Sequence, residues 1–314
     1  MNHLASRLLQ VAVLVGAAPL CSAWCARLRA WFQRRQGAGL SRPYANLFKL
    51  FAKEDLRPPG SSRVFAAAPR VGFLALGIAA AVLPVWQPAA LLRAPADFFL
   101  LAGGLALARF ALSLGALDSG GAFAGMGASR EALVAALAEG PMLLALVAVA
   151  LVTDHSSLSA IAAATLHQPF VPISAVRLLA LGSLAMVALA EAGRIPVDNP
   201  TSHLELTMLH EAMVLDYSGA SLAWVEWAAS LRLLLFLTLI ANIFFPWGLA
   251  TAAGWLPACA AAALWAGKIA LLAVFVALLE ATLAKLRMYA VPEFLGIAAA
   301  LATLAVVFTA LPWS

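Results

Sequence analysis

The sequence predicts an all-α, polytopic membrane protein with about eight transmembrane helices and a cytoplasmic amphipathic helix. Of the 314 residues, 64% are hydrophobic and only 11% are charged, whereas soluble domains are about half apolar and a quarter charged. The mean hydropathy is +0.94. Apolar stretches recur along the whole chain with no long polar block between them, so we expect residues 1–314 to form a single integral membrane domain.

Clusters of Pro and Gly and charged stretches separate eight apolar segments. Each has about 18 to 29 residues, and at ~1.5 Å per residue each can cross a hydrocarbon core of about 30 Å, the longest ones when tilted. The predicted spans are residues 4–26, 70–87, 97–117, 130–153, 173–191, 228–249, 256–284 and 291–312.

The basic residues are divided unequally between the two sides that these spans define. The connections after spans 1, 3, 5 and 7 hold fourteen of the 20 Lys and Arg residues, the opposite side holds three, and three lie inside spans. Because basic residues concentrate in cytoplasmic loops, both termini are predicted outside the cytoplasm. A cleaved signal peptide does not fit, because one Arg precedes the first apolar segment and four follow it closely. The net charge of +5 therefore reflects membrane topology and no nucleic-acid partner.

The first cytoplasmic loop, about residues 27–70, contains a stretch with helical periodicity at residues 40–56. One face of this helix carries the apolar residues Tyr44, Leu47, Phe48 and Phe51, with Leu50 beside them. This pattern predicts an amphipathic helix, either as a lipid-surface anchor or as one wall of a chamber shared with a cytoplasmic partner. The basic residues predicted to dock that partner are Arg34, Arg35, Arg42, Lys49 and Lys53.

The second cytoplasmic loop, about residues 191–219, is acidic. It holds five of the fifteen acids, two histidines and one base, namely Glu191, Asp198, Glu205, Glu211, Asp216, His203, His210 and Arg194. A solvated loop can carry such charge without function, but here the acids alternate with apolar residues on the otherwise basic side. No His-x3-His pair is present, so no metal site is predicted. The three cysteines likewise lack zinc or iron–sulfur spacing, which places any redox centre in a partner.

Five charged residues fall inside predicted spans: Arg109, Glu139, Arg232, Lys268 and Glu280. Each costs about 2.5 to 3.5 kcal/mol in a bilayer, so these side chains should face the bundle interior and pair or carry ions. Arg109 and Glu139 lie at matching depth, about 12 to 13 Å from the cytoplasmic ends of their spans. They form either a structural ion pair or part of an ion pathway. A stand-alone secondary transporter is disfavoured, because the two halves of the chain show no convincing internal repeat.

Several motifs resemble one family over essentially the whole chain. They are Arg34-Arg35-Gln36-Gly37, the GASREA segment at 127–132, Asp216-Tyr217-Ser218-Gly219 and Phe245-Pro246-Trp247-Gly248. With the eight-span layout they resemble the NADH dehydrogenase subunit 1 family of complex I. The segment RIPVDNPTSHLELTMLHEAM at 194–213 is most similar to the membrane subunits of group 4 nickel–iron hydrogenases, of the hydrogenase-4 component C and formate hydrogenlyase type.

This resemblance implies a non-catalytic membrane-anchor and energy-coupling subunit in the bacterial inner membrane, with no catalytic residue and no cofactor of its own. Nickel–iron and iron–sulfur centres are expected in partners, namely the cytoplasmic hydrogenase large and small subunits and iron–sulfur proteins; antiporter-like membrane subunits complete the complex and move protons or cations.

The resemblance also implies a proton path. Acidic positions of that path match Glu139, Glu191, Asp198, Glu205, Asp216 and Glu280, with Arg194 beside them and Arg109, Arg232 and Lys268 as further candidates. A quinone-site subunit of respiratory complex I is the alternative. The chain departs from that pattern, because Pro196-Val197-Asp198 replaces Pro-Phe-Asp, and Thr201 and His203 stand where acids are expected.

Overall fold

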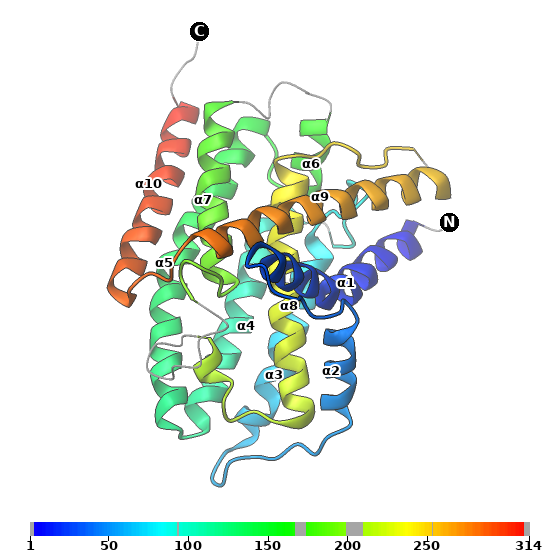
Figure 1. The fold of residues 1–314 in the computed structure, drawn as a ribbon. Helices are drawn as coiled ribbons and strands as arrows, with labels where there is room; N and C mark the ends of the chain where they lie inside the picture. The colour runs from blue at the N-terminus through cyan, green and yellow to red at the C-terminus, as the bar shows by residue number, and fades with distance from the viewer. Residues whose placement is uncertain (1–2, 93, 167–173, 199–209, 253, 311–314) are drawn as a thin grey trace.

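The computed structural model describes residues 3–310 except residues 93, 167–173, 199–209 and 253. The described residues form helices and connecting turns, without a β-strand (Figure 1). In chain order the helices are α1 (His3–Phe32), α2 (Arg42–Phe51), α3 (Arg63–Val82), α4 (Phe98–Asp118), α5 (Ala122–Thr153), α6 (Leu158–Leu166), α7 (Ala175–Glu191), η2 (Glu211–Met213), α8 (Gly219–Ile243), α9 (Trp255–Thr282), η3 (Met288–Ala290) and α10 (Val291–Ala310).

Seven of the described helices are long and apolar enough to cross a membrane, namely α1, α3, α4, α5, α8, α9 and α10. The chain is therefore a multi-pass membrane protein. The remaining predicted span, residues 173–191, corresponds to α7, which has 17 residues from Ala175 to Glu191. At ~1.5 Å per residue α7 is about 26 Å long, slightly shorter than a typical hydrocarbon core. Its crossing of the membrane stays a prediction.

Several helix boundaries differ from the hydropathy prediction. Helix α5 begins at Ala122 and α8 at Gly219, whereas the predicted spans begin at residues 130 and 228. The added first turns include several Gly and Ala residues as well as Ser129 of α5 and Ser221 and Glu226 of α8, because helix formation depends on backbone hydrogen bonds and does not require a continuous apolar sequence. For the same reason α1 continues through its basic end to Phe32, beyond the predicted limit at residue 26.

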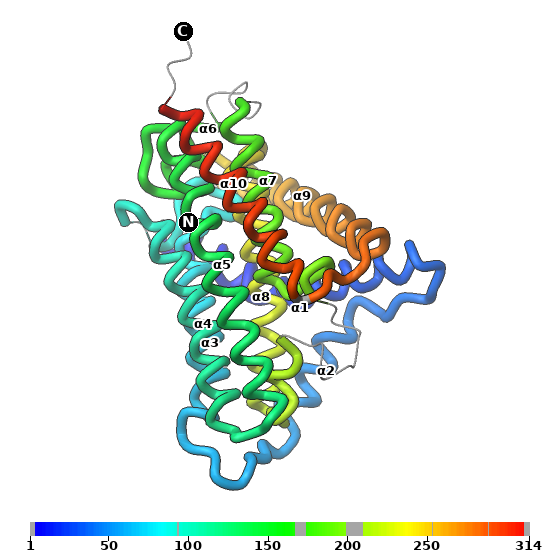
Figure 2. The backbone as a smooth tube through the Cα atoms, turned by 90° about the vertical axis from the view of Figure 1, so that its left-hand side faces the viewer, coloured from blue at the N-terminus to red at the C-terminus, as the bar shows by residue number. Residues whose placement is uncertain are grey.

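Helix α8 lies at the centre of the fold and packs against α1, α2, α3, α7 and α9. Helices α3, α4, α5, α7, α8 and α10 run in broadly similar directions. In both views α1 and α9 cross that direction (Figures 1 and 2). The inclined pair α1 and α9 also contact each other, so they form a separate layer against the central helix.

Helices α3 and α4 pack closely through small residues. A Cβ atom on Gly104 would lie 2.9 Å from the carbonyl oxygen of Ala75 and 3.1 Å from the Cβ of Ala79. Small side chains allow two membrane helices to approach this closely. The contact fixes the position of α4, and with it the depth of Arg109.

The predicted amphipathic segment forms α2, and two of its apolar residues pack against α8. Leu47 and Leu50 are buried against Ala223 of α8, whereas Phe48 is 75% exposed. Helix α2 therefore packs on the side of α8 through Leu47 and Leu50, and the role of its apolar face at a lipid surface or in a chamber wall stays a prediction. The position of α2 on the cytoplasmic side stays a prediction.

Candidate functional site

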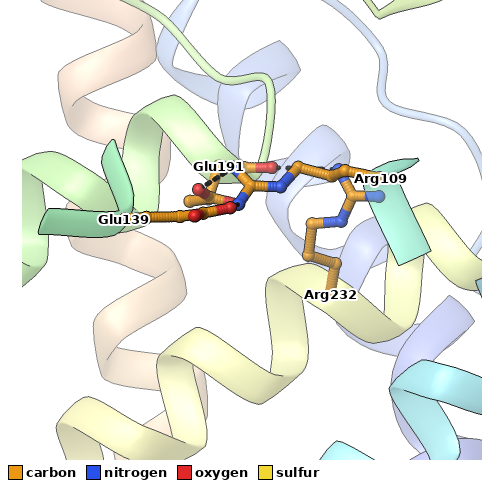
Figure 3. Close-up of polar contacts among 4 residues, drawn as sticks. All are labelled: Arg109, Glu139, Glu191 and Arg232. Carbon is orange, nitrogen blue, oxygen red and sulfur yellow. Dashed lines mark hydrogen bonds and ion pairs between the residues drawn. The ribbon is translucent and has the colours of Figure 1, made fainter. Parts of the chain in front are cut away.

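Four helices bring charged side chains together in the interior. Arg109 of α4 donates from Nη2 to Glu139 Oε1 of α5 at 2.8 Å, and its Nη1 forms an ion pair with Glu191 at the end of α7. Arg232 of α8 donates from Nη1 to the backbone carbonyl oxygen of Glu191 at 3.3 Å. Figure 3 shows these four side chains. Arg109 and Glu139, for which the sequence predicts matching depth in the membrane, are therefore in contact. Glu191 binds the same Arg109 side chain.

The two carboxylates that Arg109 binds have different environments. The side chain of Glu191 is fully buried, whereas that of Glu139 is 42% exposed. Glu139 opens into a groove of about 660 Å³ between α4 and α5, here called the lateral groove, which Arg109, Glu131, Ser113 and Ser129 also line. One guanidinium thus links a sealed carboxylate to one that solvent or a partner can reach.

Glu131 is an additional acid of this cluster. It lies on α5 about two turns before Glu139, is 8% exposed, and acts electrostatically on Glu191 and Arg232. Sequence reasoning missed Glu131 as a site residue because the predicted span began at residue 130 and placed it at the membrane surface. The signal that could have found it was its helical spacing of eight residues from Glu139.

The buried charges of this cluster balance, and the accessible Glu139 adds a third carboxylate. Among the described residues, three carboxylates (Glu131, Glu139 and Glu191) lie near two guanidinium groups (Arg109 and Arg232). The buried Glu191 Oε2 also has no hydrogen-bond partner within the part of the chain that the structure describes. Leaving a buried carboxylate oxygen without a hydrogen-bond partner is costly, and a proton bound by Glu191 would remove the charge of that carboxylate. The arrangement can therefore hold and release a proton.

Glu280 of α9 is the centre of a second ion-pair group. Its Oε1 accepts from Arg194 Nη1 at 3.0 Å, and its Oε2 lies 3.5 Å from Arg29 Nη1 of α1. The Glu280 side chain is fully buried. This group ties the loop after α7 to the inclined helices α1 and α9.

Asp198 forms a third group with Lys285 and the backbone of His210. Lys285 Nζ donates to Asp198 Oδ1 at 2.8 Å, and the His210 N–H donates to Asp198 Oδ2 at 3.2 Å. Asp198, His210, Arg194 and Arg29 all line a cavity of about 600 Å³, here called the loop cavity.

His210 connects the loop cavity to the buried cluster. Together with Arg232 it also lines a small cavity of about 10 Å³, near the size that holds one water molecule. Burial, and then the nearby Arg232, lower the pKa of His210, so its imidazole is neutral at pH 7. A neutral imidazole can both accept and donate a proton. Sequence reasoning weighed His210 only as a metal ligand and missed this position.

Two of the predicted site residues within the described part of the chain, Asp216 and Lys268, are not part of these groups. Asp216 Oδ2 accepts from Ser119 Oγ at 2.6 Å, beyond the end of α4. Lys268 Nζ donates to Ala241 O, Asn242 Oδ1 and Phe245 O, at 3.2, 2.7 and 3.0 Å. Lys268 therefore caps the carbonyl end of α8, about 14 Å along that helix from Arg232. Glu205 lies outside the described residues.

The predicted docking residues Arg34, Arg35, Arg42, Lys49 and Lys53 are all exposed. Within the described residues, no group of three or more His, Cys, Asp or Glu side chains could hold a metal ion.

Known proteins of one family resemble this chain over most of its length. The family model described as NADH dehydrogenase matches residues 5–310. Formate hydrogenlyase subunit 4 of Escherichia coli (strain K12) is 32% identical over 91% of this chain and 92% of its own length. Hydrogenase-4 component C of the same strain is 29% identical over 96% of this chain and 94% of its own length. An NADH-quinone oxidoreductase subunit of Rhodopseudomonas palustris (strain BisA53) is 29% identical over 70% of this chain and 71% of its own length.

A chain of the membrane-bound sulfane sulfur reductase, an archaeal respiratory membrane complex, has the same fold. It superposes with a TM-score of 0.84 at 20% sequence identity, covering 98% of this chain and 100% of the other. The sequence matches confirm the predicted resemblance: the chain belongs to the NADH dehydrogenase family, among membrane subunits similar to those of hydrogenases and of complex I.

Proposed function

We propose that this chain is the membrane-anchor and energy-coupling subunit of a multi-subunit hydrogenase of the formate hydrogenlyase type. In this role it links a cytoplasmic nickel–iron redox module to proton or cation translocation. The two relatives named as formate hydrogenlyase and hydrogenase-4 subunits, each matched over most of its length, support the type of complex. The cluster around Arg109, which pairs with the buried Glu191 and the accessible Glu139 and lies between two cavities, is the observation that carries the coupling role.

The proposed path runs from the loop cavity through His210 and Glu191 to Glu139 and the lateral groove. A proton on Glu191 neutralises that carboxylate and leaves Arg109 paired with Glu139 alone. When the proton passes to Glu139, the buried pair of Arg109 and Glu191 forms again, and Glu139 releases the proton into the groove. A charge change in a module docked at the loop cavity alters these proton affinities, because nearby charges shift carboxylate pKa values.

The chemistry of hydrogen itself belongs to partners in this proposal. The nickel–iron and iron–sulfur centres lie in the cytoplasmic hydrogenase subunits and iron–sulfur proteins, which dock on the exposed basic surface of Arg34, Arg35, Arg42, Lys49 and Lys53. Antiporter-like membrane subunits lie along the lateral groove, where Glu139 is accessible. The complex resides in the bacterial inner membrane, with both termini of this chain outside the cytoplasm, as the distribution of basic residues indicates.

A quinone-site subunit of a respiratory complex I is the second candidate. One observation favours it: the loop cavity, at about 600 Å³, is within the range of pockets that hold small ligands. The relatives named as NADH-quinone oxidoreductase subunits are consistent with it.

Affinity purification of the tagged full chain from mild detergent tests the proposal. We expect nickel–iron hydrogenase subunits to co-purify with hydrogenase activity towards an artificial dye, and an unrelated tagged multi-pass protein to bring neither. Recovery of NADH-oxidising subunits with quinone-dependent activity would instead establish the complex I alternative. Recovery of the chain alone, under conditions that preserve other membrane complexes, would contradict both.

A further inference from the structure

One face of α1 changes from apolar to basic along its length. Ala17, Leu20, Cys21 and Trp24 line a cavity of about 310 Å³ between α1, α8 and α9. Trp24, Arg27, Leu28 and Trp31 line a second cavity of about 490 Å³. The spacing of three and four residues places these positions on one side of the helix, over about 21 Å. The two cavities share Trp24 and together are called the α1 groove.

The first part of the groove is apolar. None of the described residues that line it is charged, and the wall is completed by Leu40 of the loop after α1, Leu234 of α8, and Trp265, Ala266, Ile269 and Ala270 of α9. Its volume lies at the lower end of the range of ligand pockets. A wall of this composition accepts a hydrocarbon chain and no charged group.

The second part of the groove is basic. Arg35 and Gln36 of the loop after α1 lie on the same cavity as Arg27. A Cβ atom on Gly37 would lie 2.9 Å from Arg27 Cγ, so this loop folds tightly back against α1 and holds Arg35 near Arg27. Both arginines are exposed, and no ion pair found among the described residues includes either of them. They are therefore available to an anion.

We propose that the α1 groove binds an anionic phospholipid, with its phosphate at Arg27 and Arg35 and one acyl chain in the apolar cavity. The arginine fork matches phosphate oxygens, and basic pockets beside membrane helices are known as sites for anionic headgroups. Trp24 lies where the groove changes from apolar to basic and Trp31 lines its basic part, as aromatic residues do at the membrane surface.

The combination of the two parts excludes other occupants. An acidic protein segment would satisfy the arginines and leave the apolar cavity empty, whereas an uncharged isoprenoid quinone would fill the cavity and leave the arginines without an anion. A bound lipid would also fill the space between α1 and α9, next to the contact of Arg29 with Glu280. This inference does not depend on the proposed hydrogenase role.

Lipid titration of the delipidated full chain in detergent tests the proposal. The probes are dioleoylphosphatidylglycerol and dioleoylphosphatidylcholine with brominated acyl chains, which quench the fluorescence of nearby tryptophans. We expect the anionic lipid to bind more tightly. The double variant Arg27→Gln/Arg35→Gln should weaken its binding by roughly 25-fold, at about five-fold per surface arginine. The matched control Arg34→Gln/Arg57→Gln, which changes exposed arginines outside the groove, should stay within about two-fold.

A second pair of variants tests the apolar end. Ala270→Phe fills the cavity and should reduce quenching by the brominated lipid, whereas Ala263→Phe, at an exposed position on the same helix, should not. Equal binding of the two lipids by the wild-type chain would overturn the proposal even if no variant folds. Displacement of the anionic lipid by an uncharged quinone would also overturn it. So would arginine variants that keep full lipid affinity but lose a co-purifying protein subunit.

Discussion

Arg109 binds one buried carboxylate, Glu191, and one accessible carboxylate, Glu139. This difference in burial predicts that the coupling energies of the two ion pairs are unequal. The side chain of Glu191 is fully buried and that of Glu139 is 42% exposed. Removing one member of a buried ion pair costs about 3 to 5 kcal/mol, because the remaining charge is uncompensated, whereas exposed pairs are worth about 0.2 to 1 kcal/mol. We therefore expect a coupling energy of about 2 to 3 kcal/mol between Arg109 and Glu191, and below about 1 kcal/mol between Arg109 and Glu139.

Two double-mutant cycles measure these couplings, one with Arg109→Met and Glu191→Gln and one with Arg109→Met and Glu139→Gln. The free energy of unfolding is measured for each protein by denaturing-detergent titration in mixed micelles. Arg34→Met, at an exposed position, is the control and should change it by less than about 0.5 kcal/mol. Equal couplings, or a stronger coupling to Glu139, would refute the reasoning from burial.

Three further predictions concern packing, pH and topology. Gly104→Ala should lower the free energy of unfolding by about 1 to 3 kcal/mol, because its Cβ would meet Ala75 O at 2.9 Å, whereas Gly103→Ala, with open space around it, should not destabilise the protein. Burial raises the pKa of Asp97 from 3.8 to about 6, so the folded state binds this proton more tightly than the unfolded chain. The free energy of unfolding should therefore fall as pH rises from about 4 to about 6, and Asp97→Asn should remove that part of the pH profile; an unchanged profile would contradict it. A reporter fused after residue 314 should be active only outside the cytoplasm and one inserted near residue 60 only inside, and the reverse pattern would overturn the orientation.

The sequence predicted the features of the fold that depend on local composition. Membrane spans must be apolar, so the two segments that contain Arg109 and Glu139 were recognisable as spans from their composition. A charged residue in a span is costly, so both residues were recognisable as interior side chains that need partners. Matching depth then sufficed to suggest their contact, because both residues belong to consecutive helices whose ends lie on one side.

Features that depend on long-range packing were not predictable in this way. The pairing of Glu280 with Arg29 and Arg194 joins three segments far apart in the chain, and nothing in their local sequences specifies it. Glu131 was missed because hydropathy places the start of α5 too late. Lys268, like Arg109, is a charged residue within an apolar span, but it binds the carbonyl end of α8 and no carboxylate. An apolar neighbouring sequence indicates that a charged side chain needs polar partners. It does not indicate which partners these are.

The central claim is that Glu139 takes part in proton movement, and one preparation can test it. The complex containing Glu139→Gln is assembled and purified, and both its hydrogenase activity towards an artificial acceptor and its formation of an ion gradient in vesicles are measured. Glu293→Gln, an exposed acid on α10, is the matched control. We expect the Glu139→Gln complex to keep its hydrogenase activity and lose the gradient, and the control to keep both. An intact gradient in the Glu139→Gln complex would show that Glu139 has a structural role only.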